Sequence, residues 1–297
     1  MTVEYAPVRA VHKPWGSTDL RPWRATRDSD PVGELWFERP GAPTSDLLLK
    51  LLFTTEKLSI QVHPTDAFAR SIGLAHGKSE AWVILSAAPG AQVAVGLTHR
   101  LTAEQLRASL EDGTILDLVQ WRDVAKGDVI FVPAGTIHAI GAGLVIAEIQ
   151  QNIDATFRLY DYGRGRTLHI AKGVAASDPG PALGQTAFRA LSQSRTLLVA
   201  DSHFILEQIV LPDHGDWALA ADMEVWFLIT EGRAHLGSRL LSPGEAIFVK
   251  ADRALIHTDD GAVKGLVAYS AAAPLADLLC DVSGHDARPV ALRAAQP

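Results

Sequence analysis

Short apolar runs separated by glycine and proline constrain the fold of this chain most strongly. The 297 residues include 24 glycines and 16 prolines, and the runs between them have the length of strands rather than of helices. These runs are Leu47–Leu52, Leu58–Val62, Ala81–Leu85, Val129–Val132, Leu144–Gln150, Phe204–Val210, Val225–Ile229 and Ala246–Val249. Many short strands with frequent turn signals are typical of a sandwich or barrel of the jelly-roll kind. The sequence therefore predicts an all-β fold.

One helical segment interrupts the first half of the chain. Thr102 and Gln105 have the spacing of a capping box, in which Thr102 is the N-cap. Leu106 and Leu110 follow on one apolar face, and Gly113 ends the helix. We therefore expect a small helical insert near residues 102–120.

The chain divides into two β-rich halves. Residues 173–187 are rich in glycine, proline and alanine and indicate a linker or long loop. Gly127–Pro133 aligns with Gly244–Lys250, since each has a turn, an acidic residue and a strand that ends in Phe-Val. We expect two tandem copies of one β-fold, with domains at residues 1–185 and 186–297.

Charge and cysteine content exclude several classes of protein. The formal net charge is −7, which argues against nucleic-acid binding because phosphate backbones are held by clustered cations. A small phosphorylated substrate needs only a few local cations and stays possible. No uncharged apolar stretch is long enough to span a membrane, and the single Cys280 suits a reducing cytoplasm.

Metal-ligand side chains stand on or beside three of the predicted strands. Gln61 and His63 share one face of their strand, since alternate residues point the same way. Glu80 begins another apolar strand, and His138 follows a Pro-Ala-Gly turn. Histidine and carboxylate ligands with an amide oxygen suit Zn²⁺, and Fe²⁺ or Mn²⁺ could occupy a similar set.

The spacing from Gly127 to His138, G-x5-P-x-G-x2-H, resembles the second signature of the cupin barrel. The first cupin signature carries histidine and glutamate ligands, which are the roles open to His63 and Glu80. The resemblance implies tandem cupin (jelly-roll) barrels.

Four longer segments resemble the motifs of type I mannose-6-phosphate isomerases, most closely the short bacterial members. They are Ser59–Pro64 (SIQVHP), Gly77–Glu80 (GKSE), Phe131–Ile140 (FVPAGTIHAI) and Glu148–Arg164 (EIQQNIDATFRLYDYGR). The likeness covers about residues 15–170 well and the remainder weakly.

This resemblance implies an enzyme with one zinc ion per chain that interconverts mannose 6-phosphate and fructose 6-phosphate. We expect it to be a monomer or a weak homo-oligomer. The implied metal ligands are Gln61, His63, Glu80 and His138, and the implied catalytic residues are Arg158, Glu148 and Lys78.

The chemistry agrees with these residue types. Aldose–ketose isomerisation moves a proton between C2 and C1 through an enediol, so charge develops on oxygen and needs a fixed cation. A metal ion and an arginine both supply one. Glu148 is one candidate base, and another side chain or a metal-bound water is the alternative. Arg164 and Arg166 suit the substrate phosphate, unless they form a solvated basic loop.

The second copy lacks the ligand histidine. In its register, Leu255 stands where the first copy has His138, and His257 lies two residues late. We therefore expect the C-terminal domain to be a degenerate, metal-free cupin.

Other functions fit the same residues. They are an isomerase of a related sugar or sugar phosphate, a metal-dependent cupin oxygenase, and a non-catalytic sugar-binding module. An anion-stabilising arginine beside the metal ligands favours the isomerase.

Overall fold

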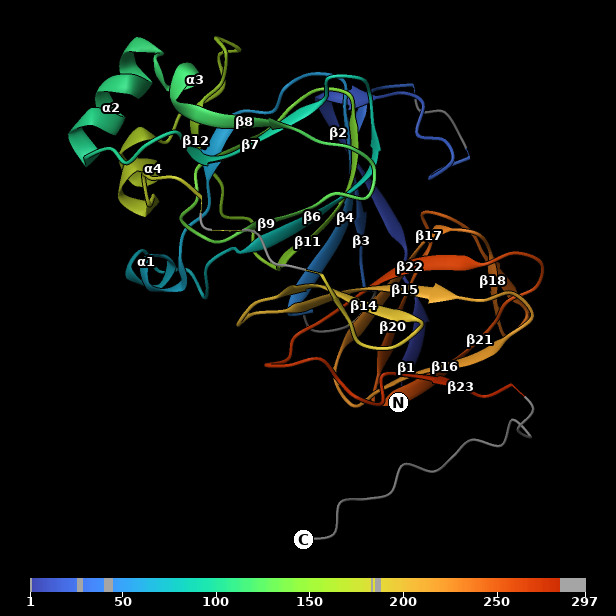
Figure 1. The fold of residues 1–297 in the computed structure, drawn as a ribbon. Helices are drawn as coiled ribbons and strands as arrows, with labels where there is room; N and C mark the ends of the chain where they lie inside the picture. The colour runs from blue at the N-terminus through green and yellow to red at the C-terminus, as the bar shows by residue number, and fades with distance from the viewer. Residues whose placement is uncertain (1, 26–28, 40–44, 183, 185–187, 284–297) are drawn as a thin grey trace, which may run out of the picture.

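A computed structural model describes residues 2–25, 29–39, 45–182, 184 and 188–283 of the chain. Their antiparallel strands form four sheets, two in each half (Figure 1). The prediction of an all-β, jelly-roll-like fold is confirmed. Among the described residues, no helix has both the length and the apolar character needed to cross a membrane.

In the N-terminal half a six-stranded sheet faces a five-stranded sheet. The larger sheet has the order β2 (Val8–Ser17), β3 (Val32–Phe37), β4 (Leu47–Thr54), β11 (Leu144–Gln151), β6 (Glu80–Ala87) and β9 (Val129–Val132). The smaller has the order β12 (Phe157–Tyr160), β5 (Ile60–Val62), β10 (His138–Ile140), β7 (Gln92–Leu97) and β8 (Val119–Asp123).

The C-terminal half repeats this plan with a seven-stranded and a five-stranded sheet. The larger sheet has the order β1 (Thr2–Tyr5), β20 (Ala246–Lys250), β17 (Val225–Glu231), β22 (Val263–Tyr269), β15 (Ile205–Leu211), β14 (Arg195–Ala200) and β13 (Arg189–Ala190). The smaller has the order β19 (Arg239–Leu241), β18 (Ala234–Leu236), β21 (Asp252–His257), β16 (Asp216–Ala221) and β23 (Leu279–Asp281).

The repeated heptapeptide occupies equivalent places in the two halves. β9 pairs with β6 in the first half, and β20 pairs with β17 in the second. Gly127 and Gly244 precede these strands with φ of 96° and 88°, a left-handed conformation that favours glycine. β1 pairs with β20, so the first strand of the chain belongs to a sheet of the C-terminal half. The predicted boundary between residues 185 and 186 lies outside the described residues.

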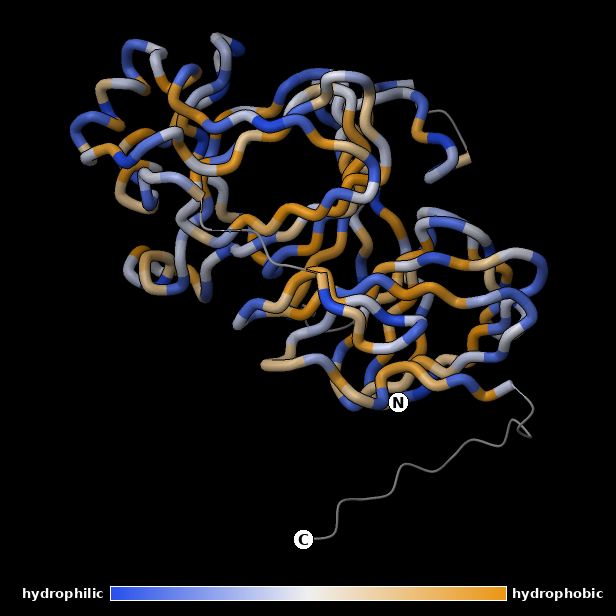
Figure 2. Tube along the Cα trace, viewed as in Figure 1, coloured by the Kyte–Doolittle hydropathy of each residue, from blue (hydrophilic) through white to orange (hydrophobic). Residues whose placement is uncertain are grey.

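The two large sheets pack against each other through one shared core. Alternate residues of β4 divide between its two faces: Leu49 and Leu51 enter this shared core, whereas Lys50 and Leu52 face the interior of the N-terminal half. Leu206 and Trp226 meet the shared core from the C-terminal side. Figure 2 shows hydrophobic residues along the strands where the two halves meet.

The helices are α1 (Asp66–Ser71), α2 (Ala103–Asp112), α3 (Ile115–Leu118) and α4 (Ile170–Ala176). The capping box predicted for α2 is present, with Gln105 N–H donating to Thr102 Oγ1 and Thr102 N–H donating to Gln105 Oε1. α4 was not predicted, because Gly173 suggested a loop. In the structure this glycine permits close packing, since a Cβ there would lie 2.3 Å from Leu159 Cδ2.

Candidate metal centre and active site

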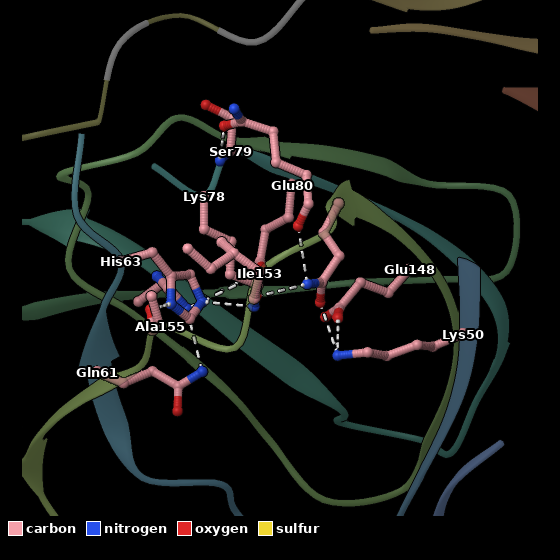
Figure 3. Close-up of polar contacts among 12 residues, drawn as sticks. Lys50, Gln61, His63, Lys78, Ser79, Glu80, Glu148, Ile153 and Ala155 are labelled. Carbon is pink, nitrogen blue, oxygen red and sulfur yellow. Dashed lines mark hydrogen bonds and ion pairs between the residues drawn. The ribbon is translucent and has the colours of Figure 1, made fainter. Parts of the chain in front are cut away.

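Three metal-ligand side chains meet inside the N-terminal half. His63 directly follows β5, Glu80 begins β6 and His138 begins β10. His63 Nε2 lies 3.2 Å from Glu80 Oε2, and His138 Nε2 lies 3.5 Å from Glu80 Oε1. The potential ligand atoms of the three residues all lie within 4.8 Å of one another, and the side chains are at most 1% exposed. Figure 3 shows His63 and Glu80 in this cluster.

Backbone carbonyl groups orient both imidazole rings. His63 Nδ1 lies 3.0 Å from Ala155 O, and His138 Nδ1 lies 2.9 Å from Thr136 O. A carbonyl oxygen can only accept, so each Nδ1 carries the proton and each Nε2 offers its lone pair toward Glu80. This arrangement is typical of metal-bound histidine.

Burial and local charge favour the protonation states that bind metal. Burial and the nearby charge of Lys78 lower the pKa of His63 to about 4, and burial also lowers the pKa of His138. Burial opposes the ionised form of Glu80, but Lys78, His63 and His138 together outweigh burial and hold the pKa of Glu80 well below its usual range. Neutral imidazole and ionised carboxylate are the forms that coordinate metals.

A divalent cation fits this donor set. Glu80 Oε2 is buried and lies 2.6 Å from Lys78 Nζ. Lys78 Nζ also lies 3.0 Å from His63 Nε2, so an ammonium group neutralises the carboxylate in this structure. The support for a metal is the donor set itself, because two imidazole nitrogens with free lone pairs converge on one carboxylate, an arrangement that suits a divalent cation.

Gln61 lies beside this cluster as a possible fourth ligand. Its Cα is opposite that of His138 in the pairing of β5 with β10, so the two side chains share one face. Its Nε2 lies 3.3 Å from His138 Nε2, and its Oε1 accepts a hydrogen bond from Ser59 Oγ at 3.2 Å. The amide oxygen therefore points away from the cluster, and a half-turn of the amide group is needed to bring it in.

A cavity of about 410 Å³ adjoins the cluster, and its walls include Gln61, Lys78, Glu148 and Arg158. Strand register explains part of this grouping. Arg158 of β12 is opposite Gln61 of β5, which is opposite His138 of β10. Arg158, Gln61 and His138 therefore form one row across the small sheet.

Glu148 is held in the cavity wall by a buried lysine that the sequence analysis missed. Lys50 Nζ lies 3.2 Å from Glu148 Oε1 and 2.6 Å from Gln150 Oε1 (Figure 3), and 4.5 Å from the centre of the Trp36 ring. The signal was present in the sequence, because Lys50 is the one charged residue within the apolar run Leu47–Phe53. A lysine there must be buried and therefore paired.

Arg158 enters the cavity without a carboxylate partner among the described residues. Its Nη1 donates a hydrogen bond to Thr167 O at 2.8 Å, and its buried Nε has no hydrogen-bond partner. Burial, and then the charge of Arg166, lower the pKa of Arg158. Part of its guanidinium group is therefore available to a ligand.

The two arginines predicted to bind phosphate share one carboxylate. Arg164 Nη2 lies 2.8 Å from Asp161 Oδ1, and Arg166 Nε donates to Asp161 Oδ2 at 2.7 Å. Arg166 also lines the cavity, whereas Arg164 Nη1 donates to Lys57 O at 2.9 Å. Their role in phosphate binding stays a prediction.

In the C-terminal half, His257 lies on the surface. Its Nδ1 is 2.7 Å from Asp216 Oδ1, its Nε2 is 3.2 Å from Asp259 Oδ1, and its side chain is 49% exposed. Leu255, which the register of the repeated heptapeptide aligns with His138, lies in β21 and is 44% exposed.

The fold and the buried His63–Glu80–His138 cluster define a two-barrel protein of the cupin type with a candidate metal site in its first barrel. No model of a known protein family matches the chain. The chain is 37% identical over 165 residues to the mannose-6-phosphate isomerase of Streptococcus mutans, which covers 53% of this chain and 52% of that protein. The chain thus matches about half the length of this curated relative.

Solved structures agree over most of the chain. The crystal structure of the mannose 6-phosphate isomerase from Bacillus subtilis has a TM-score of 0.77 and 25% identity, and the match covers 91% of this chain and 100% of that one. A mannose 6-phosphate isomerase crystallised with zinc and yttrium shares the fold at 17% identity, with a TM-score of 0.69 over 91% of this chain and 99% of that one. The predicted resemblance to mannose-6-phosphate isomerases is confirmed.

Proposed function

We propose that the chain is a zinc-dependent isomerase that interconverts mannose 6-phosphate and fructose 6-phosphate. One observation carries the proposal: the buried His63–Glu80–His138 cluster and the partly unpaired Arg158 adjoin a single cavity whose wall also holds Glu148. An oxygenase or a sugar-binding module has no need for this combination of groups.

The metal would be held by His63 Nε2, His138 Nε2 and the Glu80 carboxylate, with the turned amide of Gln61 as fourth ligand. When bound, zinc acts as a Lewis acid toward the carbonyl or hydroxyl oxygen of a sugar. Lys78 is the cation beside these ligands in the structure: burial opposes its charge, but Glu80 and Glu148 together outweigh burial and raise its pKa.

The chain's own residues perform the remaining steps. Arg158 stabilises the negative charge that develops on the sugar oxygens, because its guanidinium group is always ionised and rigid. Glu148 carries the proton between C2 and C1, and Lys50 holds its carboxylate at the cavity wall. Arg166, which lines the cavity, binds the phosphate group together with Arg164; the two arginines share Asp161, and Arg164 also lies 3.7 Å from Glu56 Oε2.

We further propose that the domains divide near residue 185 and that the C-terminal domain binds no metal. A cytoplasmic location and a monomeric or weakly oligomeric state, without nucleic-acid or membrane partners, complete the proposal. The exposed free Cys280 supports a reducing compartment.

An activity assay on the purified chain tests this function. Conversion of mannose 6-phosphate should stop on treatment with a chelator and return on addition of Zn²⁺, while free mannose should react poorly. Glu80→Gln keeps the shape of the side chain but removes its charge, so bound zinc and activity should both fall by at least about tenfold. Full zinc content with normal turnover in Glu80→Gln would contradict the ligand assignment.

A further inference from the structure

The two halves of the molecule touch close to the candidate metal centre, at the turn of residues 201–204 between β14 and β15. Phe204 is buried in the shared core, with its ring centre 6.3 Å from that of Phe131. The preceding residue, His203, reaches α1 of the N-terminal half, where its Nε2 lies 3.4 Å from Asp66 Oδ2. A side chain of the C-terminal half therefore contacts the helix that follows His63.

We propose that His203 is a positioning residue, through which the C-terminal half holds residues 77–80 of the candidate metal centre in place. The inference deepens the proposed function, because these residues include Lys78 and Glu80. It gives the C-terminal half a specific role beyond stabilising the fold.

Asp66 connects His203 to this segment by hydrogen bonds. Its Oδ1 accepts from Gly77 N–H at 2.7 Å and lies 3.5 Å from the donor Gln151 Nε2. Gln151 Oε1 in turn accepts from Ser79 N–H at 2.8 Å. The two amide groups on either side of Lys78 are thus tied to Asp66, one directly and one through Gln151.

Residues 77–78 have little freedom to shift unless residues 64–66 shift with them. A Cβ at Gly77 would lie 2.5 Å from Pro64 O and 2.6 Å from Asp66 N, and Lys78 N–H donates to Pro64 O at 3.0 Å. The backbone of residues 77–78 therefore packs directly on residues 64–66. Because packed backbones transmit displacement, a change at Asp66 moves Lys78 and Glu80.

His203 is itself fixed within its turn. Its Nδ1 lies 2.6 Å from Asp201 Oδ2, and its backbone N–H donates to the same oxygen at 3.2 Å. Among the described residues, Arg70 also faces Asp66, with its Nη1 3.7 Å from Asp66 Oδ2. Because these side chains are partly exposed, their ion pairs add little to the free energy of unfolding. The expected effect of His203 is therefore on the position of Asp66 and of residues 77–80.

His203→Ala tests the inference with a readout that needs neither metal nor activity. Amide hydrogen exchange within residues 76–80 should accelerate about threefold or more, while Tm changes little. Zinc affinity, measured by competition with a chelating dye, should fall about three- to tenfold. This loss is smaller than the loss typical of replacing a residue that directly contacts a metal-coordinating side chain. His203→Gln keeps a donor toward Asp66 and should recover part of both effects.

Glu231→Gln is the matched control. It removes another ion pair between the halves, in which Lys126 Nζ lies 2.6 Å from Glu231 Oε1, but Glu231 contacts nothing in residues 76–80. Exchange in residues 76–80 and zinc affinity should stay at the wild-type level in this variant.

The outcomes separate the inference from the proposed function. Unchanged exchange in His203→Ala, or equal acceleration in Glu231→Gln, would overturn the positioning role even in an active isomerase. Zinc binding and accelerated exchange without conversion of mannose 6-phosphate would instead refute the function and leave the positioning role standing.

Discussion

Several charged side chains inside the N-terminal half are compensated by close partners. Lys50 pairs with Glu148 and Lys78 with Glu80, each at 3.2 Å or less. Arg158 has no such partner among the described residues, and its buried Nε makes no hydrogen bond. A buried donor without a partner costs about 1–3 kcal/mol. Such a cost is tolerated where function requires it. Arg122 also has buried nitrogens without hydrogen-bond partners, but it does not line the cavity beside the metal-ligand cluster as Arg158 does, so we expect Arg158 to contact a ligand.

Replacement of Arg158 should separate catalysis from folding. Arg158→Ala should keep its zinc and its Tm and should bind substrate with an affinity within a few-fold of wild type. Its kcat should fall at least about a hundredfold, because a donor aimed at the transition state contributes about 3–4 kcal/mol. Arg158→Lys should recover only part of the lost kcat, because an ammonium group cannot reproduce the planar arrangement of donors in a guanidinium group. Steady-state kinetics, zinc content and thermal melting measure these quantities. A near-normal kcat with a large drop in Tm would make Arg158 structural.

At the scale of elements, the end of β12 and the turn after it depend on one carboxylate. Asp161 is 4% exposed and accepts hydrogen bonds from both Arg164 and Arg166. Burial opposes its charge, but the hydrogen bond and charge of Arg166, with Arg164, outweigh burial and lower its pKa below the usual value of 3.8. The turn that carries Arg164 and Arg166, the candidate phosphate-binding residues, is therefore organised around the carboxylate of Asp161.

Asp161→Asn should destabilise the protein in a pH-dependent way. Because the folded-state pKa lies below the unfolded value, the contribution of Asp161 is complete above about pH 4–5 and is lost as the pH falls through the folded-state pKa. At pH 7 the variant should lose at least about 2–4 °C in Tm, since breaking a buried ion pair costs several kcal/mol. Urea unfolding at several pH values should show that the difference in the free energy of unfolding between Asp161→Asn and wild type becomes smaller in acid. A constant difference would contradict this account.

For the whole molecule, the shared core makes the two halves one cooperative structure. Leu51 of β4 and Leu206 of β15 are fully buried in the same cluster. Each large sheet therefore buries one face inside its own half and the other against the partner half, which explains why β4 is apolar on both faces apart from Lys50 and Thr54.

Leu206→Ala should destabilise both halves together. We expect a loss of about 2–5 kcal/mol in the free energy of unfolding, from lost burial and the cavity left behind, with a single unfolding transition by calorimetry. Leu255→Ala removes the same atoms from a side chain that is 44% exposed and should change stability by no more than about 0.5 kcal/mol. Two separate transitions would show that the halves unfold independently.

Metal content provides a second test at this scale. The site geometry predicts one zinc ion per chain, measured by elemental analysis of the purified protein. His257→Ala should leave this stoichiometry unchanged, because His257 is exposed and paired with Asp216 and Asp259. Two tightly bound ions, or loss of zinc in the variant, would contradict a metal-free C-terminal half.

Local patterns in the sequence predicted the all-β class, the capped helix α2 and the candidate metal ligands. Alternation along a strand, capping residues and motif spacing act over a few neighbours, so they can be read directly. The resemblance in the motifs added Arg158, Glu148 and Lys78 to the site of the candidate metal ligands, which spacing alone could not do.

Contacts between distant segments were decided only by the tertiary structure. The pairing of Lys50 with Glu148, the Ala155 carbonyl that orients His63, and the contact of His203 with Asp66 each join residues far apart in the chain. Strand register and the packing of the two halves create these contacts, and neither follows from local pattern. The sequence by itself determined which side chains could bind a metal and an anion; the tertiary structure decided what holds them in place, because that depends on backbone brought together from both halves.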